Sequence, residues 1–335
     1  MSRPLLPALV LAMTLPFATG CTQSESAAQD GPSKSKKSGR DQFAADQVKD
    51  ADKAVPFDGT RAMGYLKDIC ALGPRISGSE GMEKQQTLLK KHFEQCGATV
   101  AMQRFVAKQV TRKGEEVAMA NMIVTWHPDR VRRVILCSHY DTRPIADQEP
   151  QRRDWTKPFL SANDGASGAA WMMELAHHMK DFPAAIGVDF ILFDGEEYIF
   201  ESGRDKYFIG SDYFATEYKK EQPKHKYIAG VLLDLFAGKN ARYPIEQNSA
   251  FWAGGVQDSI WKVAADLKVP AFENRRGPTV DDDHLALNKA GIPTVDIIDF
   301  GYRHWHRLTD TPEQCSGESM ETVAKVLTVW IQRIK

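Results

Sequence analysis

The chain has 335 residues, of which 42% are hydrophobic and 26% are charged. This is enough apolar material for one sizeable α/β domain, or at most two small domains. Its 43 basic and 44 acidic residues nearly cancel, to a net charge of −1. That balance excludes a global field that recruits nucleic acid or an anionic membrane, so we expect no nucleic-acid partner.

The first 20 residues have the pattern of an export signal. Arg3 precedes an apolar run over residues 5–17, which is too short for a convincing spanning helix. The segment Phe17-Ala18-Thr19-Gly20-Cys21 resembles the lipobox of bacterial lipoproteins. That resemblance implies that Cys21 is lipidated and holds the exported protein on the bacterial cell envelope, at the periplasmic face or the outer membrane. An ordinary secretory signal is the alternative.

Residues 21–54 differ in composition from the rest of the chain. Ser, Gln, Lys, Asp and Gly dominate, and large apolar side chains are almost missing. Such a segment buries too little surface to offset its ordering entropy, so we predict a flexible tether. The folded domain is then expected over residues 55–335.

Hydrophobic periodicity predicts an α/β domain. Two helices come first, three strands follow, and then helices and strands alternate. We predict helices over 60–72, 80–96, 165–179, 210–218, 256–267 and 318–334, and strands over 98–106, 119–126, 131–137, 188–193, 228–233 and 292–298. Short, largely apolar strands alternating with helices indicate a single domain with a mainly parallel central sheet and helices on both faces.

Ligand-type side chains follow four of the predicted strands. They are His139 after 131–137, the pair Glu196-Glu197 after 188–193, Asp234 after 228–233, and His306 beyond 292–298. In open α/β sheets, ligands bind beyond the carboxyl ends of the strands. The sequence therefore predicts a site at this edge.

Each candidate also has a structural interpretation. Asp164 precedes a predicted helix and could be its N-cap, and His139 could be structural. Asp234 could cap or pair with a lysine. Glu196-Glu197 could be two solvated loop residues, but adjacent carboxylates at a strand end repel unless a cation or proton separates them. One of the pair binding metal while the other acts as general base resolves that repulsion.

Taken in order, these residues resemble one enzyme family. The set His139-x-Asp141, Asn163-Asp164-Gly165, Asp194-Gly195-Glu196-Glu197, Asp234 and His306 is similar to that of the co-catalytic zinc aminopeptidases, over roughly residues 60–335. The resemblance implies that Asp164, Glu197 and His306 are metal ligands and that Glu196 is the general base. In two-zinc members, His139 and Asp234 hold the second ion and Asp164 bridges. His304 is expected at the surface.

Two further features resemble the glutaminyl cyclases, a subgroup of that family which uses one zinc ion. They are Asp282-Asp283-His284 and Trp305 directly before His306. The resemblance implies that Asp234 and Asp282 form a hydrogen-bonded acid network beside Glu196. Trp305 is then an apolar wall for the substrate, although a plain core tryptophan is the alternative. Asp296 departs from the animal cyclases, which have histidine there, and so does the loop 200–208.

The predicted function is glutaminyl-peptide cyclotransferase, an acyltransferase that closes the N-terminal glutamine of peptides or proteins into pyroglutamate and releases ammonia. One Zn²⁺ is expected. A two-zinc aminopeptidase is the alternative, since every ligand it needs is present. A non-catalytic binding domain is a third possibility, and the intact Glu196 argues against it.

Four cysteines lie in the predicted domain: Cys70, Cys96, Cys137 and Cys315. Export permits disulfides, and Cys70 with Cys96 is the first pair to test because both end predicted helices. Four free thiols are the equal alternative, because spacing does not fix the pairing.

Overall fold

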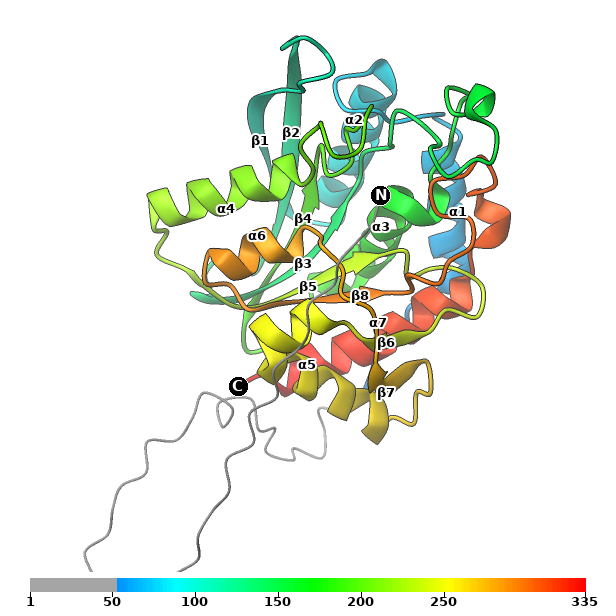
Figure 1. The fold of residues 1–335 in the computed structure, drawn as a ribbon. Coiled ribbons are helices and arrows are strands. Elements are labelled where there is room, and N and C mark those ends of the chain that lie inside the picture. The colour runs from blue at the N-terminus through cyan, green and yellow to red at the C-terminus, as the bar shows by residue number, and fades with distance from the viewer. Residues whose placement is uncertain (1–52) are drawn as a thin grey trace, which may run out of the picture. The chain divides into compact units, whose positions relative to one another are not determined.

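The computed structural model describes residues 53–335 (Figure 1). The predicted signal over 1–20 and the predicted tether, apart from residues 53 and 54, lie outside these residues. The described part is one mixed α/β domain, as predicted. None of its helices is both long and apolar enough to cross a membrane.

A six-stranded sheet forms the centre of the domain, in the order β1-β2-β4-β3-β5-β8. Strands β4, β3, β5 and β8 run parallel, while β2 is antiparallel to both β1 and β4. Their bounds are β1 Thr99–Lys108, β2 Glu116–Trp126, β3 Arg132–His139, β4 Gly187–Phe193, β5 Lys226–Asp234 and β8 Thr294–Ile298. The sheet is therefore parallel where the predicted site lies and antiparallel at the β1 edge.

Helices cover both faces of this sheet (Figure 1). Their bounds are α1 Gly59–Cys70, α2 Glu80–Gln95, α3 Ser167–Met179, α4 Ile209–Glu221, α5 Gln247–Asp266, α6 His284–Lys289 and α7 Gly317–Arg333. Short helical turns occur at η2 Arg152–Asp154, η3 Ala162–Ala166 and η4 Pro312–Gln314, and β6 Tyr243–Ile245 pairs with β7 Phe272–Arg276.

Alternation along β3 shows why both faces are covered. Val134 and Leu136 belong to the large core shared with α1, α2, α3, α5 and α7. Ile135 and Cys137 point to the other face and pack with residues of α4 and α6. Successive side chains of a strand face opposite sides, so an unbroken apolar run needs a helix layer on each side.

Side chains cap the first turns of α1 and α2. Asp58 accepts a hydrogen bond from the Arg61 amide at the start of α1, and Ser79 accepts one from the Met82 amide at the start of α2. These caps satisfy amide groups that have no partner within the helix.

The largest difference from the predicted elements is α5, which begins at Gln247 instead of residue 256. Its backbone departs from helical geometry at Ala253, with φ −131° and ψ 30°, and Gly254 and Gly255 follow. Glycine is a poor helix former, so periodicity was visible only after this pair. The short elements β6, β7 and α6 were not predicted.

All four cysteines of the described domain carry free thiols. The Cys70–Cys96 disulfide is therefore not formed in this structure. Cys70 is buried in the core, whereas Cys96 lies beside His92 at the end of α2.

Candidate active site

The carboxyl ends of β3, β4, β5 and β8 bring the predicted site residues to one edge of the sheet. Asp164 lies in η3, in the connection from β3 to α3, and Glu197 lies four residues beyond β4. His306 follows β8. Its Nε2 atom is 3.1 Å from Glu197 Oε2 and 3.6 Å from Asp164 Oδ2. The structure thus brings together the three residues predicted as metal ligands, and all three are buried.

These three residues fit a metal ion. One ligand atom from each lies within 4.8 Å of the other two. Asp164 Oδ2 and Glu197 Oε2 are buried, and among the described residues both face His306 Nε2 without a hydrogen bond of good geometry. Burial and the nearby Asp164 carboxylate raise the pKa of Glu197 to about 7. Buried oxygens without partners are costly, and a cation among them removes that cost.

Asp164 is not a helix cap. Gly165, which follows it, is non-helical, with φ 87° and ψ −42°, and α3 begins three residues after Asp164 with Ala166 as its N-cap and no side-chain cap. Its own amide donates to Asp310 Oδ2 at 3.1 Å. The capping interpretation of Asp164 is therefore wrong, which leaves its carboxylate available for the site.

A second group shares Asp164. His139 Nε2 lies 3.1 Å from Asp164 Oδ1 and 3.3 Å from Asp234 Oδ1. One ligand atom from each of these three also lies within 4.8 Å of the others. Burial alone would lower the pKa of His139, but hydrogen bonds to Asp141 and Asp164 raise it well above its usual value. The positions predicted for a second ion are thus next to each other, with Asp164 between the two groups.

Glu196 lies beside the second group, with its Oε2 3.8 Å from His139 Nδ1. Burial and the carboxylates of Asp282 and Glu197 raise the pKa of Glu196 well above its usual value. A raised pKa makes a carboxylate a stronger proton acceptor. The position of Glu196 in the pocket and the direction of this shift suit the general-base role predicted for it.

Glu196 shares a pocket of about 180 Å³ with the other predicted site residues except His139. The pocket is lined by Arg143, Asp164, Glu196, Glu197, Tyr207, Phe208, Asp234, Thr279, Val280, Asp281, Asp282, Phe300, Trp305 and His306. The indole of Trp305 stacks on the ring of His306, with centroids 4.0 Å apart. Trp305 is thus half-buried at the pocket wall, not inside the main core.

The acid network differs from the expected one. Asp234 and Asp282 both line the pocket, but no direct hydrogen bond joins Asp282 to Asp234 or Glu196 in the described structure. Asp282 Oδ1 accepts instead from the Asp283 amide at 2.6 Å. Burial and the charge of Asp234 raise the pKa of Asp282 well above its usual value. These two causes favour the protonated form of Asp282.

Supporting residues that the sequence did not reveal hold the predicted ligands in place. Asp147 Oδ1 lies 2.9 Å from His306 Nδ1, and the Arg143 guanidinium donates to Asp147 Oδ2 at 2.7 Å. The Arg143 amide donates to Glu197 Oε1 at 2.9 Å. Asp310 accepts from the Asn163 amide at 2.9 Å. These residues lie in irregular loops and belong to no strand-end motif, so no local signal marked them.

Asp141, which the sequence placed in the site, supports the Glu196-Glu197 turn. Its two carboxylate oxygens accept from the amides of Glu196 and Glu197 at 3.1 and 3.2 Å. The turn itself needs Gly195, whose φ is 71°. His304 is hydrogen-bonded to Thr309 outside the pocket lining, as expected for a residue that is not a ligand.

Comparison with known proteins places this geometry in a family. The family model described as peptidase family M28 matches residues 121–331, which include every predicted site residue. The chain belongs to peptidase family M28. The resemblance predicted from the strand-end residues is thereby confirmed.

Within this family the chain is similar to glutaminyl cyclases. The crystal structure of Fimbriiglobus ruber glutaminyl cyclase is 51% identical, with a TM-score of 0.82, and the match covers 84% of this chain and 97% of that one. The glutaminyl-peptide cyclotransferase of Boiga irregularis is 26% identical, over 63% of this chain and 64% of its own length. The match thus spans slightly less than two thirds of that curated relative.

The chain is also similar to solved structures that are named for another activity. A Zn-dependent exopeptidase from Parabacteroides distasonis is 27% identical, with a TM-score of 0.77, and the match covers 83% of this chain and 99% of that one. Fold similarity alone therefore does not separate cyclisation from hydrolysis.

Proposed function

We propose that this protein is a zinc-dependent glutaminyl-peptide cyclotransferase. Its substrates are peptides or proteins with N-terminal glutamine, and its products are pyroglutamate and ammonia. The observation that carries the proposal is the 51% identity to a glutaminyl cyclase over nearly the whole of that chain. The pocket supports it, because Glu196, Asp282 and Trp305 surround the group formed by Asp164, Glu197 and His306.

Asp164, Glu197 and His306 would hold the Zn²⁺, since carboxylate and imidazole ligands are typical of catalytic zinc sites. When bound, the ion supplies Lewis-acid polarisation of the substrate γ-carbonyl. Asp147 keeps the His306 ring oriented, and the Arg143 amide keeps the Glu197 carboxylate oriented. Hydrogen bonds of this kind fix a ligand before the ion arrives.

Glu196 moves the proton. The α-amine of the substrate attacks the γ-carbonyl carbon, and Glu196 accepts the proton that the amine loses. It then returns that proton to the amide nitrogen as the carbon–nitrogen bond breaks and ammonia leaves. Trp305 gives the substrate side chain an apolar wall, and Asp282, whose raised pKa favours its protonated form, would donate a hydrogen bond inside the pocket.

The second candidate function is a two-zinc aminopeptidase. The juxtaposition of His139, Asp164 and Asp234 favours it, because this group offers a second metal position. There Glu196 would deprotonate the attacking water, and the first peptide bond would break. One zinc per active site supports cyclisation, and two support hydrolysis.

One assay separates the two functions. The purified protein receives a Gln-initiated peptide and a Leu-initiated peptide, each with and without a zinc chelator. We expect ammonia and a pyroglutamyl peptide from the first alone, and no product after chelation. Release of free leucine from the second peptide would contradict the cyclase proposal and support the aminopeptidase.

We further propose that the protein works outside the cytoplasm, anchored to the bacterial envelope through lipidated Cys21. The supporting observation is the sequence of the first 21 residues alone. Membrane fractionation of cells expressing the protein and its Cys21→Ala variant tests this. The unaltered protein is expected in the membrane fraction, and the variant is expected to be released or left unprocessed.

A further inference from the structure

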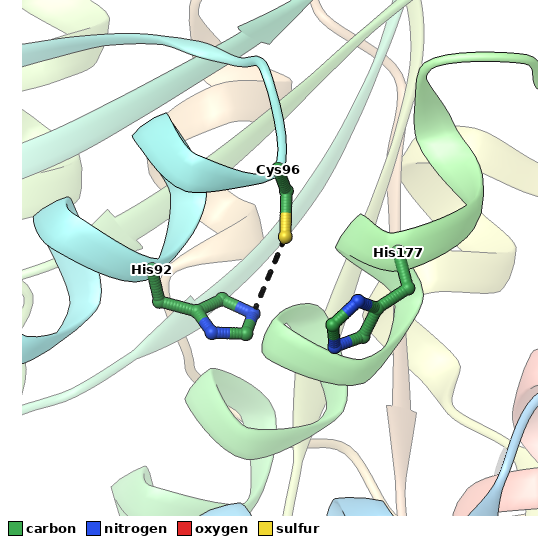
Figure 2. Close-up of side chains that lie close together, drawn as sticks. All are labelled: His92, Cys96 and His177. Atoms are coloured by element: carbon green, nitrogen blue, oxygen red, sulfur yellow. Dashed lines mark hydrogen bonds between the residues drawn. The ribbon is translucent and has the colours of Figure 1, made fainter.

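A second group of metal-ligating side chains lies on two helices away from the active site. His92 is in the last turn of α2 and Cys96 is its C-cap, so residues four apart share one face of this helix. His177 lies in the last turn of α3. Figure 2 shows the three side chains extending from the two helices toward a common space. One ligand atom from each lies within 4.8 Å of the other two.

We propose that His92, Cys96 and His177 form a Zn²⁺ site that joins α2 to α3. Zn²⁺ binds thiolate sulfur at about 2.3 Å and imidazole nitrogen at about 2.0–2.1 Å in tetrahedral geometry, so two such ligand atoms lie about 3.6 Å apart. Cys96 Sγ and His92 Nε2 are 3.7 Å apart. Two imidazoles on one tetrahedral ion have ring centroids about 5 Å apart, and those of His92 and His177 are 5.3 Å apart.

The protonation states suit metal binding. Burial lowers the pKa of His92, and burial together with the Arg61 guanidinium lowers that of His177. Both shifts favour the neutral imidazole, which is the form that binds a metal ion. Burial raises the pKa of the Cys96 thiol, which favours its protonated form, and that proton must leave when the sulfur binds the ion.

His92 must change tautomer on binding. In the metal-free chain its Nε2 lies 2.8 Å from the carbonyl oxygen of Met173 and donates to it. Coordination through Nε2 moves the ring proton to Nδ1. Met173 lies inside α3, where the helix ladder supplies its carbonyl with a backbone donor, so losing the ring contact leaves no buried acceptor unpaired.

The surrounding residues leave the site open to solvent and orient the ring of His177. A surface pocket of about 430 Å³ is lined by Tyr65, His92, Gln95, Cys96, His177, Lys180 and Asp181, which gives an ion a path from solvent and room for water as the fourth ligand. The Tyr65 hydroxyl lies 2.7 Å from His177 Nε2. Hydrogen bonds to one ring nitrogen typically orient metal-binding histidines for coordination through the other.

The site is remote from the chemistry. His177 lies ten residues along α3 from Ser167, which is about 15 Å of helix, while Asp164 precedes the start of α3. An ion here touches no residue of the active-site pocket. It would link the ends of α2 and α3 and stabilise their packing by mass action, because it binds the folded chain.

Metal analysis of four proteins tests the proposal: wild type, Cys96→Ser, His177→Ala, and the control His178→Ala. His178 is the neighbouring histidine on α3, and it faces Glu174 instead of the cluster. After equilibration with Zn²⁺ and removal of excess ion, wild type and control should hold one equivalent more zinc than the two cluster variants. Equal zinc content in all four would overturn the proposal.

Cobalt distinguishes this site from the active site. The predicted active-site ligands contain no sulfur, so thiolate-to-cobalt charge-transfer absorption reports on a cysteine ligand alone. With Co²⁺ in place of Zn²⁺, wild type should show this absorption and Cys96→Ser should lack it. Its absence in wild type, or its persistence in Cys96→Ser, contradicts the assignment. Cyclisation activity is expected to be equal in all four proteins. The zinc content and the cobalt absorption are read without any assay of activity, so this test does not depend on the proposed function.

A measurement on the unaltered chain avoids any effect of substitution on folding. Cys96 is half-buried, while Cys70, Cys137 and Cys315 are buried. Zn²⁺ should slow alkylation of Cys96 about tenfold or more, because a coordinated thiolate is a poor nucleophile. The rate is read from the Cys96 peptide by mass spectrometry. An unchanged rate at saturating Zn²⁺ would overturn the proposal.

Discussion

Asp147 and His306 form a hydrogen-bonded pair, with Asp147 Oδ1 2.9 Å from His306 Nδ1. This contact directs the other ring nitrogen, Nε2, to Glu197 and Asp164. Burial alone would raise the pKa of Asp147, but the hydrogen bond from His306 and the Arg143 guanidinium lower it to about 2. Asp147 is therefore ionised and keeps the predicted ligand in one tautomer.

The first prediction concerns this pair. Asp147→Ala should weaken zinc binding about 10- to 100-fold, the usual effect of losing a partner of a metal-binding histidine. Competition with a chromophoric chelator measures the affinity. Asp154→Ala, which removes a carboxylate paired with Lys157 at the surface, is the control and should bind zinc normally. Unchanged affinity in Asp147→Ala would show that the pair is not needed.

The second prediction separates base from ligand. Glu196→Gln should lower kcat by about 10²- to 10⁴-fold, because the amide cannot accept the proton. Its zinc content should equal that of wild type. The kcat and the zinc content are measured on the same preparation. Glu201→Gln, in an exposed side chain paired with Arg204, should leave both unchanged. Loss of zinc together with activity would mean that Glu196 is a ligand.

The third prediction concerns the pocket wall. Trp305→Ala should lower kcat/KM about 10- to 100-fold, mainly through KM, because burying an apolar side chain contributes about 1.5–3 kcal/mol. Trp305→Phe should recover most of this loss. Trp252→Ala is the control, since Trp252 is exposed on α5 and does not line the pocket. A change in kcat alone would show that Trp305 does not contribute to substrate binding.

The fourth prediction is a pH dependence of stability. Buried Glu246 caps α5 and accepts from the Val280 amide at 2.9 Å, which holds the chain just before Asp282. Burial alone would raise the pKa of Glu246, but its hydrogen bonds with His284 and with backbone amides lower it from 4.5 to about 2. A lowered pKa stabilises the fold above pH 4.5, and this stabilisation is lost as the pH falls toward 2.

Glu246→Gln should therefore lower the free energy of unfolding at pH 7 by on the order of 3 kcal/mol, with a smaller difference from wild type near pH 3. Urea unfolding of metal-stripped proteins measures both values, and the removal of metal keeps acid release of zinc out of the comparison. Glu94→Gln, at an exposed position on α2, should show no such dependence. A difference that does not change with pH would contradict the assigned role.

The site residues that could be predicted from the sequence are those that follow recognisable strands. His139, Glu196, Glu197 and Asp234 lie within or just beyond strands whose apolar residues are easy to recognise, so parallel topology predicted that they meet. Asp147 and Asp310 could not be found this way. Their contacts to His306 and Asp164 span more than 140 residues, and nothing local distinguishes them from surface aspartates.

The second cluster shows the same limit. His92 and Cys96 are four apart on a predicted helix, but His177 joins them only because α3 packs beside α2. The disulfide suggested for Cys70 and Cys96 is not formed in this structure. Both residues end a helix, as predicted, but that position carries no information about the distance between them.

The sequence by itself determined the fold class, the edge of the sheet that carries the site, and the family, because periodicity and strand-end residues are local properties. Tertiary structure decided the rest. It set which ring nitrogen of His306 faces the carboxylates, left Asp164 free of helix capping, and buried enough carboxylates together to raise the pKa of Glu196 and Asp282. Those properties depend on distances and burial between distant segments, which exist only after the chain has folded.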